Sequence, residues 1–179
     1  MKKVKDCRFI MDILVFSDSH GNLRNLQKAL DNQIKKPDAI LFLGDGLSSF
    51  QYFDFQNIPF YSVSGNCDGD FYGTLFSDEE RIIELGKKKI MMTHGHRYDV
   101  KHTLTRLVYT AASRDVDIVL YGHTHIAHEC VLTPDNCEMP KLQKPLYIMN
   151  PGAIGSGGSS FGVISISHRG EVLLSHGRV

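Results

Sequence analysis

Short apolar runs that stop abruptly at polar residues or glycine are the feature that most constrains the fold of this chain. Four of them stand out, at residues 13–16, 39–43, 60–63 and 117–121. Runs of this length are too short for helices and are typical of buried β-strands. The segment 22–36 separates the first two runs and has apolar residues at helical spacing, with Asn22 as its expected N-cap: Leu23, Leu26, Leu30 and Ile34. This order predicts a βαβ unit with parallel strands.

The rest of the chain predicts one more helix and a series of hairpins. The helix is expected over residues 101–113, where four apolar residues share one face: Leu104, Leu107, Val108 and Ala111. Further strands are expected without intervening helices, at residues 81–85, 87–94, 128–133, 145–150, 161–167 and 171–175. We therefore expect an α/β fold in which two mixed sheets pack face to face, with helices outside.

The length and composition favour a single domain without a membrane or nucleic-acid partner. The chain has 179 residues, so we expect one domain over 11–179, with 1–10 as a dispensable extension or the result of an upstream start codon. Its formal net charge is zero, which gives no general attraction for nucleic acid. It has no apolar run near the roughly 20 residues of a membrane span, and its four cysteines form no CxxC pair. We expect a cytoplasmic protein and leave its oligomeric state open, homo-oligomers included.

Polar segments follow five of the apolar runs, at the points where the predicted strands end. They are SDSHGN at 17–22, GDG at 44–46, SGNCD at 64–68, THGH at 93–96 and GHTH at 122–125. In an open α/β sheet, ligands bind in the crevice outside the carboxyl ends of the strands. We therefore expect the five segments to meet at one site.

These segments carry the residue types that bind hard or borderline divalent metals. The candidate metal ligands are Asp18, His20, Asp45, Asn66, His94, His123 and His125. Asp18 and His20 are two residues apart, which in extended backbone places both side chains on the same side, and His123 and His125 have the same spacing. Seven donors exceed the need of one ion, and the lack of thiolate donors argues against structural zinc. Two ions about 3.5–4 Å apart that share a carboxylate account for the number.

In this order the five motifs resemble those of the calcineurin-like metallophosphoesterases, in particular their small bacterial and archaeal phosphodiesterases. The resemblance runs from about Met11 to the C-terminus, and NPGAIG at 150–155 is similar to the family's Asn-Pro-Gly-Ser segment, with Ala153 in place of serine. It implies an α/β/β/α sandwich, the metallo-dependent phosphatase fold, with a two-metal centre. By the same resemblance, one ion would be held by Asp18, His20 and His125, the other by Asn66, His94 and His123, with Asp45 as the bridge.

The candidate catalytic residues are Asn66, Cys67 and His96. Many relatives have histidine directly after the asparagine, near the phosphate, where this chain has Cys67. A thiol with its ordinary pKa of about 8.5 offers no positive charge to a dianionic monoester, which favours diesters. Cys67 could equally be a small packing residue, and His96 could contact phosphate, orient a neighbour or cap a turn. Asp68 is expected to orient other groups, and four histidines are expected at the surface: His102, His128, His168 and His176.

We therefore expect a metal-dependent phosphodiesterase that hydrolyses a small phosphodiester through a two-metal centre, with a metal-bound hydroxide as the nucleophile. Manganese is the expected metal, with iron, zinc and nickel as alternatives. Two other functions stay open. One is a phosphomonoesterase, and the other is a non-catalytic interaction module similar to the retromer scaffold subunit, which resembles this fold but has a degraded metal site. The intact Asp18-x-His20 pair and Asn66 favour an enzyme.

Overall fold

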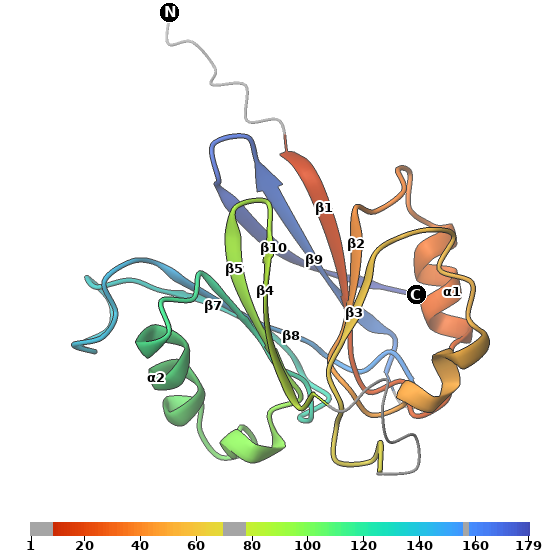
Figure 1. The fold of residues 1–179 in the computed structure, drawn as a ribbon, viewed down its shortest axis with the longest axis horizontal. Coiled ribbons are helices and arrows are strands. Elements are labelled where there is room, and N and C mark those ends of the chain that lie inside the picture. The colour runs from red at the N-terminus through yellow and green to blue at the C-terminus, as the bar shows by residue number, and fades with distance from the viewer. Residues whose placement is uncertain (1–8, 70–77, 156–157) are drawn as a thin grey trace, which may run out of the picture.

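The computed structural model describes residues 9–69, 78–155 and 158–179, which form two five-stranded β-sheets between α-helices (Figure 1). The first sheet has the order β10-β9-β1-β2-β3, with strands β1 (Phe9–Phe16), β2 (Ala39–Phe42), β3 (Phe60–Ser62), β9 (Ser160–Ser167) and β10 (Val172–Arg178). The second has the order β4-β5-β6-β8-β7, with strands β4 (Glu80–Leu85), β5 (Lys88–Thr93), β6 (Ile118–Leu120), β7 (Ala127–Leu132) and β8 (Leu146–Pro151). The predicted α/β fold with two mixed sheets is confirmed.

Each sheet has a parallel centre and antiparallel additions. In the first sheet β1, β2 and β3 are parallel, with Ile13 opposite Ala39, while β9 runs antiparallel to both β1 and β10. In the second sheet β5, β6 and β8 are parallel, and β4 and β7 pair antiparallel at the two edges. The parallel strands β1, β2 and β3 and the parallel strands β5 and β6 therefore deliver the five polar segments from their carboxyl ends.

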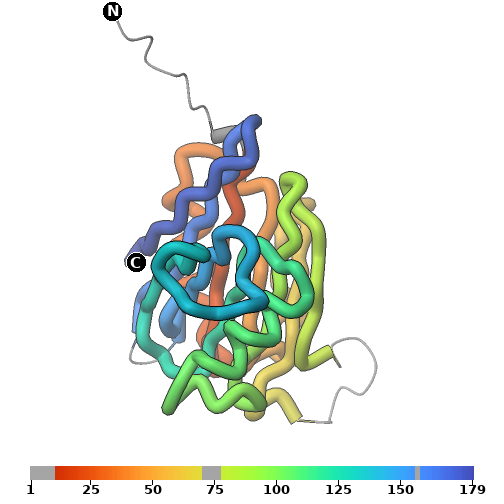
Figure 2. The backbone as a smooth tube through the Cα atoms, turned by 90° about the vertical axis from the view of Figure 1, so that its left-hand side faces the viewer, coloured from red at the N-terminus to blue at the C-terminus, as the bar shows by residue number. Residues whose placement is uncertain are grey.

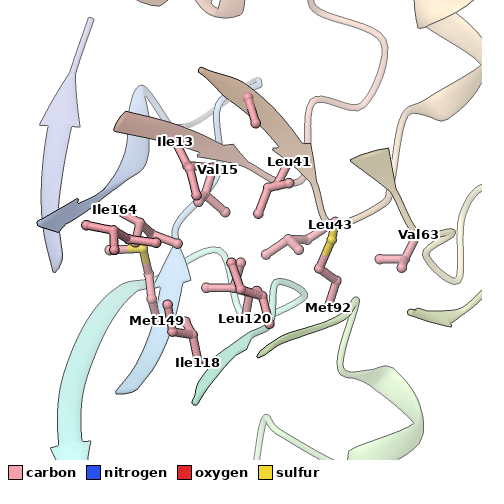
Figure 3. Packing of buried hydrophobic residues seen from close by; sticks show 13 residues of the cluster. Ile13, Val15, Leu41, Leu43, Val63, Met92, Ile118, Leu120, Met149 and Ile164 are labelled. Atoms are coloured by element: carbon pink, nitrogen blue, oxygen red, sulfur yellow. The ribbon is translucent and has the colours of Figure 1, made fainter. Parts of the chain in front are cut away.

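The main core lies between the two sheets, and each outer face is covered separately. Thirteen buried apolar residues from both sheets fill the centre, among them Val15, Leu41, Leu120 and Met149 (Figure 3). Helix α1 (Arg24–Asp31) packs through Leu26 on the outer face of the first sheet. Helix α2 (Thr105–Ser113) and the loop between β7 and β8 cover the outer face of the second sheet (Figure 2). The result is the expected four-layer sandwich.

The first helix is shorter than the sequence pattern predicted. It begins at Arg24, so Asn22 is not the N-cap, although its Oδ1 accepts a hydrogen bond from the Arg24 N–H at 3.2 Å. It ends at Asp31, and Ile34 is fully exposed beyond it. The side chain of Gln33 donates to the carbonyl of Ala29 at 2.7 Å, which satisfies one of the last helical acceptors. The predicted place of Ile34 in the apolar stripe is therefore wrong.

The predicted boundary after residue 10 cuts into the first sheet. Strand β1 begins at Phe9, which pairs with Ser167 of β9. Residues 1–8 lie outside the described part of the chain, and their dispensability stays a prediction. Within the described residues, no helix combines the length and the apolar character that a membrane span requires.

Candidate metal centre

The five polar segments meet at the carboxyl ends of the parallel strands, as the sequence predicts. Ligand atoms of Asp18, His20 and His125 lie within 4.8 Å of one another, and so do those of Asp18, Asp45 and His94. The second group extends to His123, whose Nδ1 lies 3.2 Å from His94 Nε2. Six of the seven predicted ligands therefore form one continuous cluster around Asp18.

The backbone that carries these ligands is left-handed, not extended. Asp18 and His20 have φ of 55° and 44°, and His123 and His125 have φ of 68° and 60°. The expectation that extended geometry aims both members of each pair is therefore wrong. The members of each pair have the same backbone handedness because both segments curl tightly after their strands end. Asp and His enter this conformation at lower cost than β-branched residues.

Asp18 has the properties of a metal ligand. Its side chain is completely buried, and its Oδ2 accepts the His123 N–H at 3.1 Å. Its Oδ1 accepts no well-aligned hydrogen bond within the described residues, although His125 Nε2 lies only 3.1 Å away and His94 Nε2 3.9 Å away. A buried carboxylate oxygen that lacks a donor is costly unless a cation approaches it.

Asp45 and His94 shift each other's pKa toward the charged form. Burial alone would raise the pKa of Asp45, but hydrogen bonds and charge from His94, together with the Cys67 N–H at 2.8 Å, hold it well below its ordinary value. Burial opposes protonation of His94, yet Asp45 and Asp18 raise its pKa above 6.5. His94 Nδ1 donates to the carbonyl oxygen of Leu43 at 2.8 Å, which leaves Nε2 facing Asp45 at 3.4 Å.

The donor set fits divalent metal ions. A carbonyl partner on one ring nitrogen, as at His94, is the usual way to orient the other nitrogen toward a metal. Burial and the charge of His94 lower the pKa of His123 to about 4, so its imidazole is neutral at pH 7, as ligation requires. Ionised Asp45 and the unpartnered Asp18 oxygen supply the negative charge.

Asp68 holds the loops after β2 and β3 together. Its Oδ2 accepts the N–H groups of Asp45 and Gly65, both at 2.7 Å. Its Oδ1 accepts those of Gly46 and Leu47 at 2.7 and 2.8 Å. Four hydrogen bonds to one half-buried carboxylate fix the backbone of Asp45, so Asp68 orients other groups, as the sequence analysis expected.

Asn150 is a positioning residue that the sequence analysis did not single out. It is completely buried, and its Nδ2 donates to the carbonyl of Gly122 at 2.8 Å and to Thr124 Oγ1 at 3.0 Å. Its Oδ1 accepts the Gly152 N–H at 2.9 Å. These hydrogen bonds hold in place the backbone of the segment that carries His123 and His125. The only signal in the sequence was the NPG motif itself.

The three predicted catalytic residues are more exposed than the buried ligands Asp18, Asp45 and His94, and we call the side of the cluster that they mark its open side. Asn66 and Cys67 are exposed, and Asn66 Nδ2 donates to Cys67 Sγ at 3.3 Å. Burial and the nearby Asp45 raise the pKa of the Cys67 thiol. The His96 ring lies 5.5 Å from that of His94, and burial together with the His94 charge lowers the pKa of His96. Its Nδ1 is buried without a hydrogen-bond partner in the described residues. Exposed Cys67 is thus not the small buried packing residue of the alternative reading.

Two of the four histidines outside the motifs are exposed as predicted, and two are not. His102 and His168 face solvent. His128 is half-buried, and its Nδ1 lies 3.0 Å from the hydroxyl of Tyr121. His176 is also half-buried and donates to the Asn150 carbonyl at 2.8 Å. The prediction of a solvated surface position is therefore wrong for His128 and His176, because β7 and β10 bring them against neighbouring strands.

Comparisons with known proteins point to one protein family. Residues 11–169 match the calcineurin-like phosphoesterase superfamily domain. The probable metallophosphoesterase YsnB of Bacillus subtilis is 31% identical over 142 residues, 75% of this chain and 79% of YsnB. Phosphodiesterase MJ0936 of Methanocaldococcus jannaschii is 27% identical over 146 residues, 71% of this chain and 84% of MJ0936.

Solved structures share the fold over almost the whole chain. A conserved uncharacterized protein of Streptococcus pneumoniae has a TM-score of 0.61 at 27% identity, covering 94% of this chain and 98% of that one. Vacuolar Protein Sorting 29 of Cryptosporidium parvum has a TM-score of 0.67 at 18% identity, covering 96% and 100%, and is a likeness of fold alone. With the domain match over residues 11–169, the chain belongs to the calcineurin-like phosphoesterase superfamily.

Proposed function

We propose that this protein is a metal-dependent phosphodiesterase with a two-metal centre that acts on a small phosphodiester. The observation that carries the proposal is the buried Asp18 oxygen without a hydrogen bond, surrounded by imidazole and carboxylate donors from separate strand ends. The phosphodiesterase named among the relatives supports the reaction class. The free state of the three described cysteines supports a reducing compartment, and we propose the cytoplasm.

The proposed ligand sets add Asn66 to the six residues of the cluster. Asp18, His20 and His125 would hold one ion, and His94, His123 and Asn66 the other, with Asp45 between them. Two bound divalent ions would activate a water molecule for attack on phosphorus and neutralise charge on the phosphate oxygens. Manganese is the proposed metal, with iron, zinc and nickel as alternatives, because mixed imidazole and carboxylate donors suit them all.

Asp45, His123 and Asp68 prepare the centre for metal binding. Asp45 stays ionised and His123 stays neutral at pH 7, so neither must lose a proton before an ion binds. The four N–H groups that Asp68 accepts prevent the Asp45 segment from relaxing when the charges around it change. Preorganised ligands of this kind lower the cost of reorganisation during the reaction.

The groups on the open side favour diesters over monoesters. The pKa of Cys67 is raised and that of His96 is lowered, so both side chains are uncharged at neutral pH. A dianionic monoester gains no ion pair from either residue, whereas a diester carries one negative charge fewer and has less need of one. We assign to Cys67 and His96 contact with the phosphate or its leaving group.

The test is release of nitrophenol from bis-p-nitrophenyl phosphate by chelator-stripped protein as manganese is added back. p-Nitrophenyl phosphate, the matched monoester, is assayed in parallel. Turnover that depends on metal and is faster on the diester is expected. A dominant monoester rate would overturn the diester assignment. Ion binding without turnover in manganese, iron, zinc or nickel would refute catalysis and leave the interaction module as the function.

A further inference from the structure

A third group of donors lies in the candidate centre and is not explained by the proposed ligand sets. Ligand atoms of His20, Asp45 and Cys67 lie within 4.8 Å of one another. His20 and Asp45 already belong to the proposed metal ligands, but Cys67 does not. Cys67 is therefore the one sulfur atom in the described residues that joins a group with metal-ligand geometry.

The position of Cys67 is fixed by its neighbours on both sides. Its N–H donates to Asp45 Oδ1 at 2.8 Å, which ties its backbone to the carboxylate at the middle of the centre. Its side chain is exposed toward the open side, and its sulfur accepts a hydrogen bond from Asn66 Nδ2 at 3.3 Å. The sulfur is therefore held beside the ligand atoms of His20 and Asp45.

An independent observation shows that the same centre is built for a cation. Asp18 Oδ1 is completely buried and has no hydrogen-bond partner among the described residues. Ligand atoms of Asp18 lie within 4.8 Å of those of His20 in one group and of those of Asp45 in another. Asp18 and Cys67 thus belong to separate groups of donors that share His20 and Asp45.

We propose that Cys67 is a direct thiolate ligand of this centre, together with His20 and Asp45, when a thiophilic divalent ion such as zinc or cobalt occupies it. This inference rests on the proposed metal centre. On binding, the S–H bond of Cys67 breaks, a sulfur–metal bond forms, and the proton passes to the buffer. Thiolate donors select zinc and cobalt, whereas manganese prefers oxygen donors and leaves Cys67 as a thiol.

The consequence is a centre whose ligand set depends on the metal. With manganese, the Cys67 thiol is free to contact the phosphodiester. With zinc, the sulfur is occupied, and the open side of the centre loses that contact. Cys67 therefore acts as a metal-dependent specificity residue, because the identity of the ion decides whether its sulfur faces the substrate or the ion.

Cobalt titration of the chelator-stripped full chain tests the proposal by absorption spectroscopy. The wild-type protein is expected to develop a near-ultraviolet thiolate-to-cobalt charge-transfer band together with the visible bands of bound cobalt. Cys67→Ser is expected to lose the charge-transfer band and keep visible bands. Cys137→Ser, a cysteine in the loop between β7 and β8, is the matched control and should keep both. Because Cys67 is exposed, its replacement leaves the core intact, which thermal unfolding of the metal-free variants would verify.

The outcomes separate this proposal from the function on which it rests. Visible cobalt bands without a thiolate band in the wild-type protein would overturn ligation by Cys67 and leave the metal centre standing. No binding of cobalt or manganese at all would overturn both.

Metal competition provides a second readout. Cys67→Ser is expected to lower zinc affinity by about tenfold or more, since losses of 10–100-fold already follow from changes outside the ligand shell. Manganese affinity is expected to change by less than about threefold, because manganese prefers oxygen donors. Equal losses for the two metals would contradict the proposal.

Discussion

Replacing Asp68 by asparagine would test whether the metal centre depends on a carboxylate that binds no metal. Asp68 accepts four backbone N–H groups at 2.7–2.8 Å, two at each oxygen. Asparagine keeps the shape of the side chain but replaces one oxygen by an NH₂ group. Two backbone N–H donors, either those of Asp45 and Gly65 or those of Gly46 and Leu47, would then face another donor.

The expected loss of stability follows from the number of bonds removed. Hydrogen bonds to charged groups contribute about 1.5–3 kcal/mol each, so two of them give an upper limit of about 6 kcal/mol. Asp68 is only half-buried, and water recovers part of this loss. We therefore expect Asp68→Asn to lower the free energy of unfolding by about 2–4 kcal/mol and manganese affinity by about 10–100-fold.

Urea denaturation of the metal-free protein and calorimetric titration with manganese would measure the two effects. Asp54→Asn is the matched control, because Asp54 is exposed and accepts a single backbone hydrogen bond, from the Gln56 N–H at 2.7 Å. If Asp68→Asn unfolded at the same urea concentration as Asp54→Asn and bound manganese equally well, the positioning role of Asp68 would be refuted.

Three further changes address the ligands and the packing around them. His123→Ala should lose manganese affinity by about tenfold or more and diesterase activity with it, measured by calorimetry and nitrophenol release; intact activity would contradict its assignment, and exposed His102→Ala is the control. Gly122→Ala should lower the unfolding free energy by about 1–3 kcal/mol, because its Cβ would overlap Ser17 Oγ; an unchanged urea midpoint would argue against this close contact. Manganese affinity should rise with pH as the proton leaves His94, whose pKa is raised above 6.5, whereas His123, with a pKa of about 4, is already neutral there; calorimetry that finds a flat profile would count against ligation by His94. In the metal-free protein the sign is opposite, because protonated His94 stabilises the fold below pH 6.5 and that contribution is lost as the pH rises through its raised pKa.

The place of the site could be predicted from the sequence because it depends on topology. Polar segments after parallel strands must meet where the strands end, whatever the details of the loops. The strands themselves are short apolar runs whose burial follows from composition. The meeting of Asp18, Asp45 and His94 could therefore be predicted from topology alone, without knowledge of side-chain packing.

The conformation of the ligand segments depends on contacts between distant parts of the chain. A Cβ on Gly46 would overlap Ser19 Oγ and lie 2.9 Å from the His20 nitrogen, so the loop after β2 approaches the His20 segment this closely only because residue 46 is glycine. Asn150 donates to Gly122, 28 residues away in the sequence. Local spacing contains no such information, so the extended geometry inferred for the ligand pairs was wrong, and Asn150 went unnoticed.

Pro37 limits how far helix α1 can extend toward β2, although the helix already ends at Asp31. Pro37 follows Lys36, and the residue before a proline is biased away from helical backbone. The spacing of Ile34 from Leu30 suited a helix, but Ile34 is exposed because the chain must leave the helix to enter β2 at Ala39.

The candidate metal centre carries a conformational cost that the rest of the fold must offset. Five candidate ligands have a left-handed backbone: Asp18, His20, Asp45, His123 and His125. Each such residue costs of the order of 1–3 kcal/mol when its surroundings hold it there. The hydrogen bonds of Asp68 and Asn150 supply that restraint, since both accept from or donate to the backbone of the ligand segments. Packing alone does not require this restraint, because a loop with relaxed backbone dihedral angles would form its backbone hydrogen bonds at a lower cost in free energy. We attribute it to the need to keep donor atoms converged beside a buried carboxylate oxygen that accepts no hydrogen bond from the described residues.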